Sequence, residues 1–288
     1  MTINLVSLVL ATYGRCTDVG RLLDSLAAQT DTAFEVLVID QNPDERLREH
    51  IDHALAHGLS IRHLRLAKPS LSGARNLGIA QALGEIIGFP DDDCWYEQDT
   101  VAKVRAAFAQ TDGIEGVVGT WVELLPGRNG TTPTGSLLYA DWRRFRGQGA
   151  SSITLFFSRK LCARLNGFDE RFGVGKWYGA AEETDFILRA LASGARVDYC
   201  PEAIVHHAPP LAAMASLLAS CRSMRSRGRG TGGVYGKHRM SAWVILRGIA
   251  GQVVRPLLAG HFRRVPIGAS ASLGFVEGLV VWRCTESR

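Results

Sequence analysis

Short runs of branched aliphatic residues alternate along the first two thirds of the chain with longer segments of helical periodicity. The short runs have the length and composition of buried strands and lie at residues 4–11, 34–40, 60–66, 85–89, 116–125, 152–158 and 196–199. The segments with apolar residues at intervals of three and four lie at residues 18–29, 44–57, 72–83, 100–110 and 180–193. This alternation predicts an α/β fold, with a mostly parallel sheet that carries helices on both faces.

Polar residues follow three of these predicted strands at their carboxyl ends. A turn at residues 12–15 follows the first strand, Asp40 ends the second, and Asp91, Asp92 and Asp93 follow the fourth. Open α/β sheets bind their ligands outside the carboxyl ends of the strands. We therefore expect these three segments to form one ligand site.

Charge is distributed unevenly along the 288 residues. Residues 1–210 carry 21 basic and 26 acidic side chains, whereas residues 211–288 carry 12 basic and 2 acidic, which gives net charges of −5 and +10. We predict a domain at residues 1–210 and a helical, basic and amphipathic extension at residues 211–288, with a helix break at residues 225–236. Because the larger part is acidic, we expect no nucleic-acid partner.

The cysteines and the apolar segments indicate the compartment. None of the six cysteines forms a C-x-x-C pair, so neither a zinc site nor a redox dithiol is predicted, and their wide spacing is typical of a reducing compartment. Residues 1–13 lack the basic start of a signal peptide, and no window offers about 18 uncharged apolar residues. We expect a cytoplasmic protein without a membrane span.

Two interpretations of the extension stay open. Its arginines and apolar residues are suited to peripheral contact with the anionic inner face of the cell membrane. Alternatively, its helices pack on the domain, with the arginines solvated or closing over a phosphate-bearing ligand.

The three consecutive carboxylates at residues 91–93 repel one another, so a cation beside them would offset the cost of bringing them together. Carboxylate oxygens suit Mg²⁺ or Mn²⁺, ions that are often shared with the phosphates of a substrate. The alternative is a solvated acidic turn. The position at the end of a strand, beside other polar features, favours the metal site.

Three further segments carry side chains that are suited to ligand binding or catalysis. Residues 72–78 (SGARNLG) place small residues and Arg75 at a helix start, which suits a nearby anion. Residues 181–185 (AEETD) place acids at another helix start, either as capping residues or as a general base. His206 and His207 follow the last predicted strand and are either metal ligands or packed side chains.

Together these motifs resemble glycosyltransferase family 2. The segments that carry the resemblance are VSLVLATYGR at residues 6–15, VLVID at 36–40, GARNLGI at 73–79, FPDDD at 89–93, GFDERF at 167–172, EETD at 182–185 and PEAIVHH at 201–207. The resemblance covers residues 4–207. It implies a GT-A fold with a Rossmann-like nucleotide-binding half at residues 1–95 and an acceptor-binding half at residues 96–210. It also implies inverting transfer of a sugar from a nucleotide diphosphate-sugar, with Mg²⁺ or Mn²⁺ as cofactor.

The resemblance also implies roles for the nucleotide-binding residues. Thr12 and Asp40 would contact the base and ribose, and Arg75 the nucleotide. Asp91 and Asp93 match the outer positions of the family's DxD motif, with Asp91 directed to the ribose and Asp93 to the metal. Asp92 is a competing ligand for either.

The acids of residues 182–185 fall where the family has its catalytic base. We favour Glu183, with Glu182 and Asp185 as alternatives. Either His206 or His207 would complete the metal shell, and the sequence register favours His207. Trp177 and Tyr178, just before the base, are expected either to form a platform for the acceptor sugar or to pack inside a loop.

The donor and the acceptor remain open in the sequence. A UDP-, GDP- or dTDP-sugar is expected as donor, and a saccharide or lipid-linked hydroxyl as acceptor, as in the synthesis of cell-envelope polysaccharides. The family often has Asp-Gly-Ser after the residue matched by Asp40, whereas this chain has residues 41–43 (QNP), so the donor base is not indicated. The alternatives are a sugar nucleotidyltransferase, whose glycine-rich phosphate loop residues 11–15 do not supply, and a non-catalytic nucleotide-binding protein.

Overall fold

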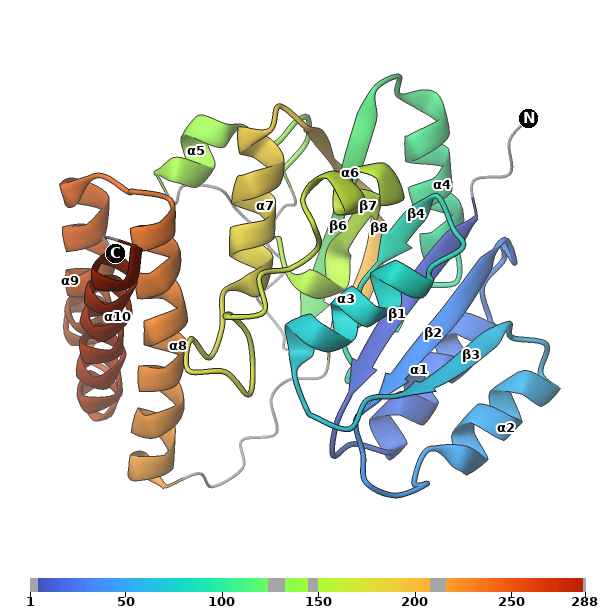
Figure 1. The fold of residues 1–288 in the computed structure, drawn as a ribbon, viewed down its shortest axis with the longest axis horizontal. Helices are drawn as coiled ribbons and strands as arrows, with labels where there is room; N and C mark the ends of the chain where they lie inside the picture. The colour runs from blue at the N-terminus through green and yellow to red at the C-terminus, as the bar shows by residue number, and fades with distance from the viewer. Residues whose placement is uncertain (1–4, 124–132, 145–149, 208–215, 287–288) are drawn as a thin grey trace.

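The computed structural model describes residues 5–123, 133–144, 150–207 and 216–286 (Figure 1). Its strands are β1 (Val6–Thr12), β2 (Phe34–Asp40), β3 (Ile61–Arg65), β4 (Ile86–Gly88), β5 (Cys94–Tyr96), β6 (Ile114–Glu123), β7 (Leu155–Ser158) and β8 (Arg196–His207). Its α-helices are α1 (Thr17–Ala27), α2 (Arg48–Ala56), α3 (Leu71–Gln81), α4 (Thr100–Gln110), α5 (Tyr139–Arg143), α6 (Arg159–Arg164), α7 (Glu182–Ala192), α8 (Leu217–Lys237), α9 (Ala242–Leu258) and α10 (Val265–Glu286). The 3₁₀ turns Ser152–Thr154 and Phe262–Arg264 precede β7 and α10.

The strands form one mixed sheet in the order β3-β2-β1-β4-β7-β6-β8-β5. Strands β3, β2, β1 and β4 are parallel, as are β6 and β8. Strands β7 and β5 run antiparallel to their neighbours. The predicted α/β sheet is confirmed. The three-residue strand β5, which no pattern predicted, forms by pairing with the distant β8.

Alternate residues of β1 face the two helical layers that cover the sheet. Leu8 and Leu10 lie in the core on the side of α1, and Val9 lies in the core on the side of α3. Gly78 of α3 lies so close to β1 that an added Cβ would collide with the side chain of Val9. The small residues of the segment 72–78 therefore bring α3 against the sheet.

Strand β8 is longer than the predicted segment 196–199 and continues to His207. Its pairing with β6 shifts register between Val118 and Thr120, and Pro201, which cannot donate to a ladder, lies within this irregular part. Beyond it the strand pairs with β5, with Cys94 opposite His207. The two histidines thus belong to the strand and do not follow it.

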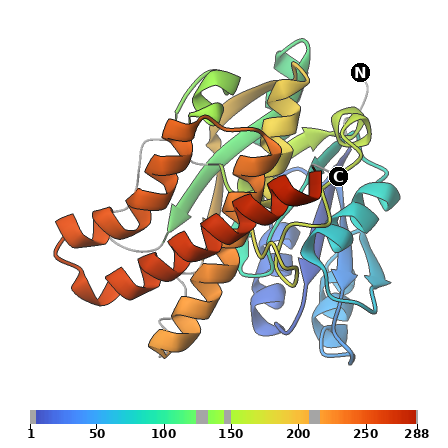
Figure 2. The same ribbon diagram turned by 60° about the vertical axis from the view of Figure 1, so that its left-hand side comes forward.

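The C-terminal extension consists of α8, α9 and α10, which lie beside one another at one end of the sheet (Figures 1 and 2). The predicted break at residues 225–236 is wrong, because α8 is continuous through Lys237. Its glycines have a packing role: a Cβ on Gly228 or Gly232 would collide with the backbone of α10 at Ala271 or Phe275. Glycine lowers the helix propensity but allows the two backbones to approach, and this tertiary contact outweighs the propensity.

One helical segment of the described residues, Phe262–Thr285, is long and apolar enough to cross a membrane, since it contains an 18-residue window with a mean hydropathy of 1.5. In that window 39% is buried inside the protein, since one face packs on α8. The predicted domain boundary near Pro209 and Pro210 lies outside the described residues.

Candidate active site

A cavity of about 550 Å³ opens at the carboxyl end of the parallel strands. It is lined by the turn after β1, the residue after β2, the start of α3, the three aspartates, the end of β8, the loop before α7, and α8. The structure thus brings together the turn at residues 12–15 and the aspartates at residues 91–93, as the predicted strand ends required.

Asp92 and Asp93 are held by a hydroxyl group at the end of β1 and by a guanidinium in the turn that follows. Thr12 Oγ1 donates to Asp92 Oδ2 at 2.9 Å. Arg15 Nε lies 3.1 Å from Asp92 Oδ1, and its Nη1 lies 2.7 Å from Asp93 Oδ2. Burial raises the pKa of Asp92 to about 6, against the opposing effect of Arg15. The guanidinium of Arg15 therefore provides the positive charge that these two carboxylates need.

Asp93 and His207 meet because β5 pairs with the end of β8. His207 Nε2 lies 3.1 Å from Asp93 Oδ1, and both residues line the cavity. Burial would raise the pKa of Asp93, but His207 and Arg15 together lower it. His206 points to the other face of β8, where its Nε2 lies 2.6 Å from Glu97 Oε1 and its ring stacks on Trp95.

The pair Asp93 and His207 fits a divalent cation shared with a ligand. Within the described segments, no group of three His, Cys, Asp or Glu residues is arranged to hold a metal by itself. Mg²⁺ and similar ions bind through one or two protein groups and complete their shell with water and substrate phosphates. A carboxylate and an imidazole at the edge of an open cavity match this mode of binding.

Arg75 links Asp91 to Glu182 of α7 and does not line the cavity. Its side chain is 1% exposed; Nη2 lies 3.0 Å from Asp91 Oδ1, and Nη1 lies 3.0 Å from Glu182 Oε1. Asp91 also accepts a hydrogen bond of 3.2 Å from Ser152 Oγ. Burial raises the pKa of Asp91 and Arg75 opposes that rise. The buried guanidinium of Arg75 thus joins the two acidic segments through an ion pair on each side.

Glu183 lies at the start of α7 next to Glu182, and neither of these two acids is among the residues that line the cavity. Desolvation, followed by the charge of Glu182, raises the pKa of Glu183 to about 8. An acid of such a pKa accepts a proton more readily than an ordinary carboxylate. Glu182, by contrast, is paired with Arg75.

Asp185 is fully buried and paired on all sides. Its carboxylate accepts from Arg189 Nε, Lys237 Nζ and His238 Nε2, each at 2.8 Å. The hydrogen bond from His238 and the charges of Arg189 and Lys237 overcome the effect of burial and lower the pKa of Asp185. Asp185 thus ties α7 to α8 and does not line the cavity.

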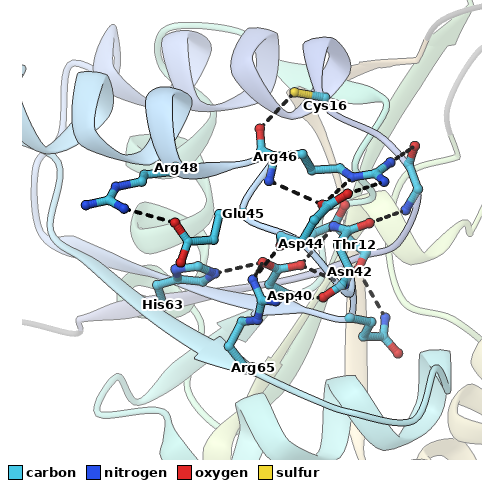
Figure 3. Close-up of polar contacts among 12 residues, drawn as sticks. Thr12, Cys16, Asp40, Asn42, Asp44, Glu45, Arg46, Arg48, His63 and Arg65 are labelled. Carbon is cyan, nitrogen blue, oxygen red and sulfur yellow. Dashed lines mark hydrogen bonds and ion pairs between the residues drawn. The ribbon is translucent and has the colours of Figure 1, made fainter.

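Asp40 is 1% exposed and held by protein donors (Figure 3). Its Oδ1 accepts two hydrogen bonds of 2.8 Å from the backbone and side-chain nitrogens of Asn42. Its Oδ2 lies 3.0 Å from His63 Nε2 and accepts from Arg65 Nη1 at 3.0 Å. The next residue, Gln41, is the one of this segment that lines the cavity.

Trp177 and Tyr178 differ in exposure. Trp177 is 44% exposed, and the guanidinium of Arg229 lies 5.0 Å from its ring centroid. Tyr178 is 8% exposed and packs against Phe172 and, across the boundary to the extension, Trp282. Of the two, Trp177 is the one with exposed ring surface on which a sugar could stack, and neither residue is among those that line the cavity.

Five polar residues that line the cavity were given no individual role by the sequence, namely Tyr13, Arg15, Gln41, Ser70 and Arg227. The first four lie at strand ends or at a helix start, so their position relative to the predicted elements could have indicated them. Arg227 lies on α8, 134 residues beyond Asp93, and no local pattern in the sequence places it there.

A model of the family described as Glycosyl transferase family 2 matches residues 7–164. Among curated proteins, an uncharacterized glycosyltransferase of Nostoc sp., alr2836, is 25% identical over 114 residues, which are 39% of this chain and 35% of that protein. The uncharacterized glycosyltransferase EpsJ of Bacillus subtilis is 33% identical over 91 residues, 32% of this chain and 26% of EpsJ. The matched parts thus span about a third or less of these relatives.

Solved structures share the fold over nearly the whole chain. S. aureus TarS 1-349, in complex with UDP-GlcNAc, superposes with a TM-score of 0.60 at 17% identity, covering 95% of this chain and 91% of that one. The mannosyltransferase PcManGT of Pyrobaculum calidifontis, in complex with GDP-Man and Mn²⁺, gives a TM-score of 0.65 at 16% identity, covering 98% and 88%. These neighbours show the fold, including the helices that follow the sheet.

Proposed function

The chain belongs to glycosyl transferase family 2 and has the GT-A fold, and from this premise we propose that it transfers a sugar from a nucleotide diphosphate-sugar to a hydroxyl group. The acceptor is a saccharide or a lipid-linked saccharide of cell-envelope glycan synthesis. The reaction depends on Mg²⁺ or Mn²⁺ and inverts the anomeric centre.

The observation that carries this proposal is the contact between Asp93 and His207, both of which line the cavity. The carboxylate of Asp93 and the two aspartates beside it would repel a bare diphosphate. They would bind it once a divalent cation is shared between protein and phosphate, and such a cation would neutralise the charge that develops on the leaving diphosphate. TarS bound to UDP-GlcNAc and PcManGT bound to GDP-Man and Mn²⁺ share the fold and support a donor of this class.

The other residues of the site have distinct tasks in this proposal. Tyr13 and Gln41 line the end of the cavity nearest β1 and β2, where the base and ribose would lie. Arg15 now neutralises Asp92 and Asp93, and metal binding would release it towards the phosphates. Arg75 is a positioning residue that keeps Asp91 and Glu182 in a fixed relation.

Glu183 is the general base of the proposed reaction. Its carboxylate takes the proton of the acceptor hydroxyl while the hydroxyl oxygen bonds to the anomeric carbon. The bond from that carbon to the β-phosphate oxygen breaks, and its electron pair leaves with the nucleoside diphosphate. Because attack and departure occur on opposite faces of the sugar in one displacement, the configuration inverts.

Thermal shift with UDP, GDP, CDP and dTDP, each with and without Mn²⁺, tests the donor site. A nucleotide that binds only the folded state raises the Tm by about 5–10 °C at 100 times its Kd. We expect such a rise for one nucleotide with Mn²⁺, and none for the Asp93→Ala variant. Asp99→Ala, which removes a half-exposed acid outside the cavity, is the matched control and should respond like the wild type.

If the wild type responds to no nucleotide, the chain has no competent donor site. If it responds equally without Mn²⁺, the metal has no part in donor binding. If Asp93→Ala responds like the wild type, the aspartate has no part in it. A response that needs neither Mn²⁺ nor Asp93 would favour a nucleotide-binding protein over a metal-dependent transferase.

On the acceptor side, we propose that the extension contacts an anionic membrane at the connection between α9 and α10. This connection projects from the rest of the protein (Figure 2) and carries Leu258, 84% exposed, and Phe262, 70% exposed. Arg263 and Arg264 follow and are also exposed. Apolar side chains flanked by arginines bind the headgroup region of anionic bilayers.

Flotation with phosphatidylglycerol vesicles and with phosphatidylcholine vesicles tests the membrane contact. We expect the wild type to float only with the anionic vesicles, and the double variant Leu258→Ser, Phe262→Ser to remain at the bottom. A wild type that does not float with phosphatidylglycerol contradicts this part of the proposal without affecting the donor site.

A further inference from the structure

The extension reaches into the cavity through a single helix, α8. Arg227 of α8 lines the same cavity as Asp91, Asp92, Asp93 and His207. The boundary of the catalytic site therefore includes a residue from a part of the chain beyond the segment that matches the family model, which ends at residue 164.

The position of Arg227 is set by close backbone contacts. The backbone N–H of Gly179, in the loop before α7, donates to the carbonyl of Ser226 at 3.2 Å. One turn further along α8, a Cβ on Gly230 would collide with the backbone of Ala180. The residue that follows Ser226 is thus held beside the loop that leads to Glu183.

The neighbouring arginines of α8 are engaged elsewhere. Arg225 and Arg229 both pair with Glu277 of α10. Residues two apart on an α-helix point about 200° apart, so Arg227 faces away from Glu277 and towards the cavity. In the part of the chain that the structure describes, no carboxylate lies within ion-pair distance of the Arg227 side chain.

The other arginines at the site already have carboxylate partners. Arg15 is held by Asp92 and Asp93, and Arg75 is buried between Asp91 and Glu182. Of the two arginines that line the cavity, Arg227 is therefore the one available to an incoming anion. A guanidinium binds phosphate oxygens through two parallel N–H donors, which makes it well suited to a terminal phosphate.

We propose that Arg227 binds the β-phosphate of the nucleotide diphosphate, so that the extension completes the donor site. This inference rests on the proposed function and assigns one of its contacts. Arg227 then faces the metal-binding wall of Asp93 and His207 across the diphosphate. It also stabilises the charge that remains on the β-phosphate when the sugar leaves.

Isothermal titration in the presence of Mn²⁺ tests the assignment with a nucleoside diphosphate and the corresponding monophosphate. The nucleoside is the one among U, G, C and dT that binds the wild type most tightly. We expect Arg227→Gln to weaken diphosphate binding about 10- to 100-fold and to leave monophosphate binding within about twofold, because only the diphosphate has the contacted group. Arg227→Lys should recover part of the loss.

Arg222→Gln, which removes an exposed arginine of the same helix outside the cavity, is the matched control and should bind both nucleotides like the wild type. Because the Arg227 side chain is exposed, Arg227→Gln should keep the wild-type Tm. An unchanged diphosphate affinity in Arg227→Gln overturns the proposal, and a raised KM for a phosphorylated acceptor would then assign the residue to that ligand. Equal weakening of diphosphate and monophosphate also overturns it.

Inorganic pyrophosphate with Mn²⁺ separates this inference from the proposed function. If the wild type binds pyrophosphate but no nucleotide, and Arg227→Gln weakens that binding, the phosphate contact stands and the nucleotide-sugar donor is wrong. If the wild type binds neither probe, both are overturned.

Discussion

The sheet and the C-terminal extension are packed in opposite ways. In the sheet, branched side chains such as Leu8 and Val9 fill the space between strands and helices. In the extension, Gly228 and Gly232 remove side chains from the contact, so that α8 and α10 touch through their backbones. The difference teaches that a glycine-rich segment with low helix propensity can still form a rigid helix when its neighbour requires close approach.

The two regions also differ in whether their charged side chains are buried or exposed. The sheet region pairs its buried cationic groups with carboxylates of the same region, as in the ion pairs of Arg75 with Asp91 and Glu182. The extension leaves most of its arginines at the surface, and Arg227 faces the cavity. The sheet region thus holds the acidic residues of the candidate site in place, whereas the extension contributes a positive charge to its lining.

Glu183→Gln should have the largest effect, since it removes the proton acceptor of the sheet region and leaves the extension intact. We expect turnover to fall about 10²- to 10⁴-fold while binding of the nucleoside diphosphate with Mn²⁺ is unchanged. Steady-state kinetics and titration calorimetry measure the two quantities. Glu202→Gln, an exposed acid on β8, is the control; a turnover loss below tenfold in Glu183→Gln would exclude Glu183 as the base.

The pH profile sharpens the same assignment. Because the carboxylate form is the base, the rate should rise with pH and level off above about pH 8. The folded protein retains the proton of Glu183 up to about pH 8, whereas the unfolded chain releases it near the ordinary pKa of 4.5. Stability therefore decreases between these pH values, and Glu183→Gln should lack that part of the decrease in a series of Tm measurements. A rate that is flat from pH 6 to 9 contradicts the assignment.

Asp185→Ala should break the connection between the two regions. The substitution leaves Arg189, Lys237 and His238 without the buried carboxylate that they share, at a cost of about 3–5 kcal/mol in the free energy of unfolding. Urea denaturation measures this loss. Asp112→Ala, at an exposed turn, should change stability by less than about 0.5 kcal/mol; a similarly small change in Asp185→Ala would show that the cluster does not hold the extension in place.

Gly232→Ala tests the packing of the extension itself. The new Cβ would meet the backbone of Phe275, so we expect α8 and α10 to separate slightly and unfolding to become about 1–3 kcal/mol easier. Gly251→Ala in α9 is the matched substitution, because only the Arg255 side chain lies near its Cβ, at 3.8 Å. It should stabilise the protein by about 0.5–1 kcal/mol. Equal effects of the two substitutions would contradict the backbone contact.

Local patterns predicted most of the sheet region, including the full extents of β2 and α4. They did so because strand and helix periodicities repeat within a few residues. Strand β5 and the helical course of residues 225–236 were not predicted, since each depends on a partner far along the chain.

The candidate site likewise contains segments that local patterns brought together and contacts that depend on partners far along the chain. The segments that follow β1 and β4 were placed together in advance, because parallel strands end at one edge of a sheet. The contact of Asp93 with His207 needed the pairing of β5 with β8, and the position of Arg227 needed the packing of α8 on the loop before α7. The roles of these residues stay predictions.

Release of nucleoside diphosphate from a panel of UDP-, GDP-, CDP- and dTDP-sugars is the most direct test of the central claim. We predict that the wild type consumes one donor class, only with Mg²⁺ or Mn²⁺, and that Asp93→Ala lowers the rate at least about 100-fold. The claim is contradicted if no donor is consumed with either metal in the presence of saccharide acceptors. It is also contradicted if Asp93→Ala turns over the donor at the wild-type rate.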